Sequence, residues 1–198
     1  MFSWKRFKIN RLMKKLLGMQ RNRIHNPPTE EILKKEVEGY HLLASMYQKL
    51  EGQKKFPFAK EAKCAAYRAA AMIDDVKAQF ILGKILLDEG KMRKEWEQGL
   101  FASQNNSRMM ALLFEDALGF LEAAEKNQHI EAKRQRGLCY IHGWGVSLDQ
   151  KKGFEMIVDS IQQENSWDKV PQIFASLGLN KPEFFSQLTQ MRNKTQTQ

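Results

Sequence analysis

Small residues recur in this sequence in two sets with the same internal spacing, and this repeat restricts the fold more than any other feature. Two sets match when one is displaced by 54 positions: Ala69, Ala70, Ala78 and Gly83 correspond to Ala123, Ala124, Ala132 and Gly137. Small side chains let two helices approach closely where their axes cross, while larger side chains fill the space on either side. The repeat therefore predicts an all-α fold in which helix-turn-helix pairs stack into an α-solenoid.

Turn signals divide the predicted repeat domain, residues 29–165, into three helix pairs. Gly52, Gly90 and Gly143 each follow a helical stretch, where a residue that adopts a left-handed conformation can end the helix. The predicted pairs are 30–50 with 59–72, 76–89 with 109–126, and 130–142 with 150–163. We expect two capping helices within residues 166–192, near 167–177 and 182–191, and a loose polar tail over residues 193–198.

The third predicted pair carries a pattern typical of one repeat family. Its residues are Ala132, Gly137 and Tyr140 on the first helix, Gly143, Gly145, Val146 and Asp149 in the turn, and Lys152 on the second helix. This pattern resembles the Sel-one-like repeats, which are close relatives of the tetratricopeptide repeats. The chain departs from it at Arg136, which replaces the usual leucine, and at Ser160-Ile161, which replace a final alanine pair.

The resemblance covers about residues 36–165 as three degenerate units and implies a short, right-handed α-solenoid. Ten residues are expected to hold the repeats together rather than to contact a ligand: Ala78, Gly83, Ala123, Ala124, Ala132, Gly137, Tyr140, Gly143, Gly145 and Asp149. The family consists of scaffolds that assemble complexes, often in bacterial envelope, signalling, secretion or virulence systems. The resemblance therefore implies a binding role.

Residues 1–28 form a strongly basic N-terminal arm. They contain eight lysines and arginines and no acidic residue, so they account for nearly all of the net charge of +9. Ile9, Leu12, Met13 and Leu16 recur at helical spacing, which predicts a short basic amphipathic helix between about residues 8 and 20. The dipeptide Pro27-Pro28 ends the arm.

Three roles for the arm remain open at this stage. Its apolar stripe could cap the repeats, its rings and cations could dock on an anionic membrane or a protein partner, or its charge could bind nucleic acid. The docking hypothesis names ten candidate residues: Phe2, Trp4, Lys5, Arg6, Phe7, Lys8, Arg11, Leu12, Lys14 and Lys15. Nucleic acid is the least favoured of the three because the charge is confined to one short segment.

An insertion makes the repeat spacing uneven. Ala44 and Gly83 are 39 residues apart, whereas Gly83 and Gly137 are 54 apart, and the excess falls at about residues 91–107. Insertions in repeat arrays often belong to the binding surface. Arg93, Lys94 and Trp96 are therefore candidate partner-binding residues. The competing interpretation is a solvated, irregular loop.

No combination of residues predicts catalysis or a bound metal. Gly143-Trp144-Gly145 lacks the lysine and the preceding strand of a phosphate-binding loop. Cys139 and His142 could supply two metal ligands from one helix, but a site needs two more. We therefore expect no catalytic residue, metal, cofactor or small-molecule substrate.

These patterns together predict a non-catalytic protein-protein interaction scaffold or adaptor in a bacterial complex, of the secretion, virulence or envelope-associated type. Leu16-Leu17 is followed at once by Gly18, which is too short an apolar run for a secretory signal. The expected location is the cytoplasm, with peripheral contact at the inner face of a membrane through the arm. The alternative is a nucleic-acid-associated protein anchored by its basic arm.

Overall fold

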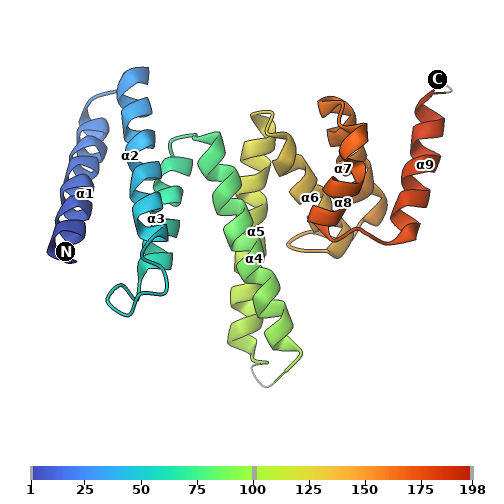
Figure 1. The fold of residues 1–198 in the computed structure, drawn as a ribbon, viewed down its shortest axis with the longest axis horizontal. Coiled ribbons are helices and arrows are strands. Elements are labelled where there is room, and N and C mark those ends of the chain that lie inside the picture. Colours follow the sequence, from blue (N-terminus) through green and yellow to red (C-terminus); the bar gives the residue numbers. More distant parts are fainter. Residues whose placement is uncertain (1, 100–101, 197–198) are drawn as a thin grey trace.

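Helices form the secondary structure throughout the described part of the chain (Figure 1). The computed structural model describes the backbone of residues 2–99 and 102–196 and the side chains of residues 4–99 and 102–190. The elements are α1 (Phe2–His25), α2 (Glu30–Gln48), α3 (Ala59–Ala71), α4 (Val76–Glu97), α5 (Gln104–Lys126), α6 (Ile130–His142), α7 (Gln150–Glu164), the 3-10 helix η1 (Trp167–Lys169), α8 (Val170–Leu177) and α9 (Pro182–Gln196). The prediction of an all-α fold is confirmed.

Consecutive helices from α1 to α7 pack against each other in a row, and α8 and α9 join the row through a shared apolar cluster (Figure 1). The most extensive contacts are α2 with α3, α4 with α5, and α6 with α7, and the α3–α4 and α5–α6 contacts join these pairs. The first and third pairs lie where the turn signals predicted them. The prediction that Gly90 ends a helix is wrong, because Gly90 lies inside α4, where a Cβ atom would lie 2.6 Å from the ring of Phe114 on α5. Close packing of the second pair, rather than a turn, therefore requires this glycine. The right-handed course of the array stays a prediction. α9 reaches Gln196, further than its predicted end, and residues 197 and 198 lie outside the described part.

Side-chain caps explain where the helices begin. The Thr29 hydroxyl accepts a hydrogen bond from the backbone N–H of Ile32, and the Asp149 carboxylate accepts one from Lys152. Such caps satisfy backbone donors that a helix leaves unpaired in its first turn. Asp75 caps α4 and also lies 2.7 Å from the ring of His41, so its side chain links α4 to α2.

Small residues lie where the paired helices cross. A Cβ atom added to Gly137 of α6 would lie 2.6 Å from the carbonyl oxygen of Gly153 on α7, so the two backbones approach too closely for any side chain. In the second pair, a Cβ atom on Gly83 would lie 2.8 Å from Leu121. Ala132 is fully buried. The crossings therefore depend on residue size, as helix packing requires.

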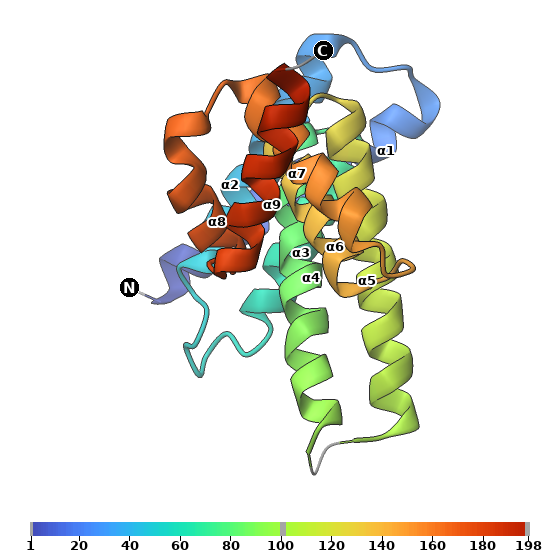
Figure 2. The same ribbon diagram turned by 90° about the vertical axis from the view of Figure 1, so that its right-hand side faces the viewer.

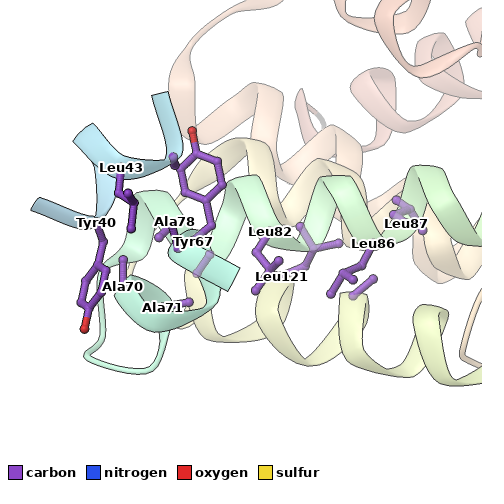
Figure 3. Close-up of a cluster of buried hydrophobic side chains, with 14 of the residues drawn as sticks. Tyr40, Leu43, Tyr67, Ala70, Ala71, Ala78, Leu82, Leu86, Leu87 and Leu121 are labelled. Carbon is purple, nitrogen blue, oxygen red and sulfur yellow. The ribbon is translucent and has the colours of Figure 1, made fainter. Parts of the chain in front are cut away.

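Two apolar clusters hold the row together. The larger one extends from α1 to α6, and Figure 3 shows part of it around Leu82, Leu86 and Leu121. The second joins α6, α7, α8 and α9 around Phe174, which is fully buried. Trp144, between α6 and α7, packs against both clusters. The C-terminal helices therefore cover the third pair, in the position expected of a cap.

The insertion lengthens both helices of the second pair. α4 continues to Glu97 and α5 begins at Gln104, so they form a long hairpin that extends beyond the other helices (Figures 1 and 2). The interpretation of residues 91–107 as an irregular loop is wrong for residues 91–97 and 104–107, which are helical. A physical reason is the amide of Asn106 on α5, which donates hydrogen bonds to the carbonyl of Arg93 and to Glu97 on α4.

Candidate interaction surfaces

The N-terminal arm is a helix packed on the repeats along one stripe. Ile9 and Leu16 are both only 3% exposed, and Leu12 is half-buried against the same cluster. Gly39 of α2 accommodates Leu16, because a Cβ atom there would lie 2.6 Å from the leucine side chain. This stripe accounts for the capping role. Met13, which helical spacing grouped with it, is instead exposed.

A buried carboxylate ties the C-terminal part of α1 to α2. Glu36 is fully buried, accepts a hydrogen bond from the Tyr40 hydroxyl at 3.1 Å, and lies 3.7 Å from Nε of Arg23 on α1. Burial, followed by the charge of Glu36, raises the pKa of Tyr40 to about 12. The second carboxylate oxygen has no hydrogen-bond partner in the described structure. The hydrogen-bonding capacity of the buried Glu36 carboxylate is therefore only partly satisfied at the α1–α2 contact.

An apolar groove runs between α1 and α3, with α2 beneath it. Its volume is about 260 Å³. The lining residues are Met13, Leu16, Leu17 and Gln20 from α1, Tyr40, Leu43 and Tyr47 from α2, and Ala62, Ala65, Ala66 and Ala69 from α3. None of these side chains is charged. The Tyr47 hydroxyl donates a hydrogen bond to the sulfur of Met13 across the groove.

The outward face of α1 combines large apolar side chains with cations. Trp4 is 61% exposed and Phe7 is 55% exposed, and their rings stack with centroids 5.9 Å apart. The Nζ atom of Lys8 lies 5.0 Å from the centroid of Trp4. A hollow further along this face is lined by Phe7, Asn10, Arg11, Met13, Lys14 and Leu17. This surface contains half of the docking residues expected from the sequence, namely Trp4, Phe7, Lys8, Arg11 and Lys14. The side chain of Phe2 lies outside the described part.

The docking residues do not all lie on that face. Leu12 belongs to the packed stripe, and Lys5 lies beside α2, where it lines a small hollow with Met46 and Leu50. Arg6 and Lys15 are exposed. The structure therefore divides the nine candidates whose side chains it describes between positions packed beside α2 and positions that stay accessible.

The three candidate contact residues of the long hairpin have different surroundings. Arg93 donates a hydrogen bond from its guanidinium to the side-chain oxygen of Asn106, 3.1 Å away, and also reaches Glu89. Its main role is therefore to join α4 to α5. Lys94 is exposed, and Trp96 is partly exposed with the Arg93 guanidinium 5.8 Å from its ring centroid.

The residues expected to be structural lie inside the array. Gly143 and Gly145 adopt left-handed conformations in the α6–α7 turn, which a residue with a side chain rarely adopts. Ala78 and Ala124 are fully buried, and Ala123 is half-buried. The Tyr140 hydroxyl accepts a hydrogen bond from Lys152, which links the two helices of the third pair.

The third pair also contains a buried arginine that the sequence did not reveal. Arg134 donates hydrogen bonds to the hydroxyls of Ser160 and Ser166 and to the carboxylate of Glu164. The hydrogen bond from Arg134 is the main cause that lowers the pKa of Glu164. α6, α7 and the segment before η1 are therefore joined by one charged group.

Cys139 and His142 do not form a metal site in the described structure. Cys139 is fully buried, and burial raises the pKa of its thiol to about 12. The ring of His142 stacks on Trp144 with centroids 4.3 Å apart. Within residues 4–99 and 102–190, no three side chains of the metal-binding types gather in one place.

The apolar groove was missed by sequence reasoning. Ala62, Ala65, Ala66 and Ala69 recur at the spacing of one helix face, which is a signal that could have shown a smooth wall. The sequence alone does not reveal that α1 stands opposite this wall, because that placement depends on the α1–α2 contact.

Comparison with protein-family models gives no match, and a search of curated proteins finds no relative. Membership of the Sel-one-like repeats therefore stays a prediction. None of the helices in the described part is long and apolar enough to cross a membrane.

Proposed function

We propose that this protein is a non-catalytic scaffold or adaptor that binds an amphipathic helix of another protein in the groove between α1 and α3. The observation that carries the proposal is the groove itself, which is open, apolar and bordered by three helices. Grooves of this kind accept the apolar face of a partner helix, whose anchoring side chains recur every three or four residues.

The groove provides both contact area and shape. Ala62, Ala65 and Ala69 give the α3 wall a low profile, while Met13 and Leu17 form the opposite wall. Burial of such side chains contributes roughly 25 cal/mol for each Å² of apolar surface removed from water. Methionine adapts its shape to different partners, which suits a binding surface.

Charge narrows the class of partner. No charged side chain lines the groove, but α1 contains seven exposed cations and no acidic residue. A partner helix with acidic residues beside its apolar face would be attracted to this end of the array. The resemblance of the third pair to Sel-one-like repeats supports a place in a bacterial complex of the secretion, virulence or envelope-associated type.

Site-specific photo-crosslinking tests the proposal. A photo-reactive amino acid replaces Ala65 in the groove or, as a control, Ala111 on α5, since both are exposed alanines on helices. In extract from the source cells, we expect position 65 to label a peptide of another protein with apolar residues at helical spacing. The Ala65→Glu variant should lose that protein from affinity capture, and Ala111→Glu should keep it.

Equal labelling from positions 65 and 111 would contradict the proposal, as would labelling of a second copy of this chain alone. Capture that survives Ala65→Glu unchanged would place recognition elsewhere on the molecule. These outcomes do not depend on the outward face of α1, which neither substitution alters.

A further inference from the structure

We infer that the outward face of α1 is a docking surface for an anionic lipid bilayer, on which the helix lies parallel to the membrane plane. This inference goes beyond the proposed binding of a partner helix and rests on the outward side of α1, which adjoins the groove at Leu17. The contributing residues are Trp4, Phe7, Lys8, Arg11, Lys14 and Leu17.

The first argument is the combination of two stripes on one helix. Ile9 and Leu16 face α2, so they already account for the attachment of α1 to the array. Phe7, Arg11 and Lys14 lie on the opposite side, at spacings of four and three residues, which places them on one face. Leu17 lies at the edge of that face, where it also lines the groove. A capping role for α1 accounts for the buried stripe only. It does not account for the large apolar side chains that are exposed to water on the other side of the helix.

The second argument is charge. Arg11 and Lys14 line the same hollow as Phe7 and Leu17, so cations and apolar groups alternate over one surface. Lys5, Arg11, Lys14, Lys15 and Arg21 form no ion pair with any residue that the structure describes. Ammonium and guanidinium groups at a bilayer surface meet lipid phosphates, while the rings and Leu17 enter the acyl boundary.

The third argument is position. α1 lies at one end of the row of helices (Figure 1), and α2 is its main neighbour. Its 24 residues give a length of about 36 Å at 1.5 Å per residue. A helix in this place can contact a flat surface along its length while the remaining helices extend away from that surface.

The surroundings of Trp4 favour a membrane over nucleic acid as the ligand of this face. Its ring is stacked on Phe7 and contacted by the ammonium of Lys8, so part of its π surface is engaged within the chain. Binding of single-stranded nucleic acid depends on aromatic faces that are free to stack on bases. Leu17 adds an exposed aliphatic group that a phosphate backbone cannot use but lipid can.

Vesicle co-sedimentation tests the inference with the full chain. We expect binding to vesicles that contain about 30% phosphatidylserine, an anionic lipid, weak binding to pure phosphatidylcholine, and loss of binding as salt is raised. The double variant Arg11→Glu with Lys14→Glu should bind roughly tenfold more weakly or worse. The matched control, Lys77→Glu with Lys151→Glu, has the same net charge but places its acids in the first turns of α4 and α7.

Ring insertion has its own readout. Anionic vesicles should shift the tryptophan emission of the wild-type protein to shorter wavelength, and Trp4→Phe should remove that shift while vesicle binding persists. The double variant Trp4→Ser with Phe7→Ser should bind vesicles roughly tenfold more weakly at unchanged charge.

Three results would overturn the inference. The first is equal binding to neutral and anionic vesicles, or binding to neither. The second is equal weakening by the α1 charge variant and its charge-matched control. The third is binding to duplex or single-stranded DNA that exceeds binding to vesicles and is insensitive to Trp4→Ser with Phe7→Ser.

Discussion

The α6–α7 pair and the α1–α2 contact join neighbouring helices in different ways. At α6–α7, Gly137 and Gly153 bring the two backbones together, and buried Arg134 has three hydrogen-bond partners, while the indole N–H of Trp144 in the turn has none in the described structure. At α1–α2, the contact is a single apolar stripe, and buried Glu36 leaves one oxygen without a hydrogen bond. The first contact fixes a geometry, whereas the second leaves surface available for binding.

The way in which two helices are joined decides how much of their surface is accessible to a partner. A close crossing of two backbones leaves no accessible surface between the helices, so it serves as a scaffold. A helix attached by one stripe keeps its other faces accessible, and on α1 those faces contain the groove wall and the cationic surface. We therefore assign rigidity to the third pair and recognition to the N-terminal end.

Overpacking the tight crossing should have the largest effect. In Gly137→Leu the new side chain would meet the Gly153 carbonyl and Ile157, so the free energy of unfolding should fall by at least about 3 kcal/mol. Chemical denaturation measures this change. Gly119→Leu is the control, because no atom lies within 4 Å of a Cβ added there, and it should leave stability unchanged or slightly higher. Equal loss in both variants would show that the crossing is not tight.

Removing the buried arginine should have an intermediate effect that depends on pH. Arg134→Met should lower the free energy of unfolding by about 2 kcal/mol at pH 7, because Ser160 and Glu164 lose hydrogen bonds to a charged group. Folding lowers the pKa of Glu164 from its ordinary value of 4.5, so its contribution is present above that pH and is lost as pH falls through the folded value.

The stability difference between wild type and Arg134→Met should therefore narrow at pH below about 4. Denaturation at a series of pH values measures this difference. A gap that stays constant or widens in acid would contradict the assigned role of Glu164.

The smallest effect should come from Glu36→Gln at the looser contact. The amide still accepts the Tyr40 hydrogen bond, and the variant removes a buried charge whose arginine partner lies 3.7 Å away. Arg23 remains partly exposed to water, so stability should change by less than about 1 kcal/mol. The pKa of Tyr40 should fall from about 12 but stay above 10, because burial remains. Ultraviolet titration against wild type measures this shift; an unchanged tyrosine titration would show that the Glu36 charge does not act on Tyr40.

The helix pairs could be predicted from the sequence because they depend on local signals. Capping residues such as Asp149, the left-handed glycine Gly143 and the 54-residue displacement are visible without any structure. The third pair begins and ends within one residue of its expected limits. Handedness is not a local property, and the sequence predicted it only through family resemblance.

The interaction surfaces could be predicted only in part. The cations and rings of the arm are visible in the sequence, but the division of α1 into a packed stripe and an exposed face depends on Gly39 receiving Leu16. Sequence-based prediction has the same limit at the hairpin. Arg93 could be assigned to α4–α5 packing only once Asn106 was placed beside it. Contacts between residues far apart in sequence decide both cases.

The central claim is that the α6–α7 pair is rigid and that α1 provides the recognition surface. Hydrogen exchange followed by mass spectrometry, with and without anionic vesicles, tests this claim most directly. In the free protein, amides of α6 and α7 should exchange slowest and those of α1 much faster, because the looser contact opens more readily. Vesicles should slow exchange in α1 alone. The account would be contradicted if α1 were as protected as α6 and α7 in the free protein, or if vesicles protected the third pair instead.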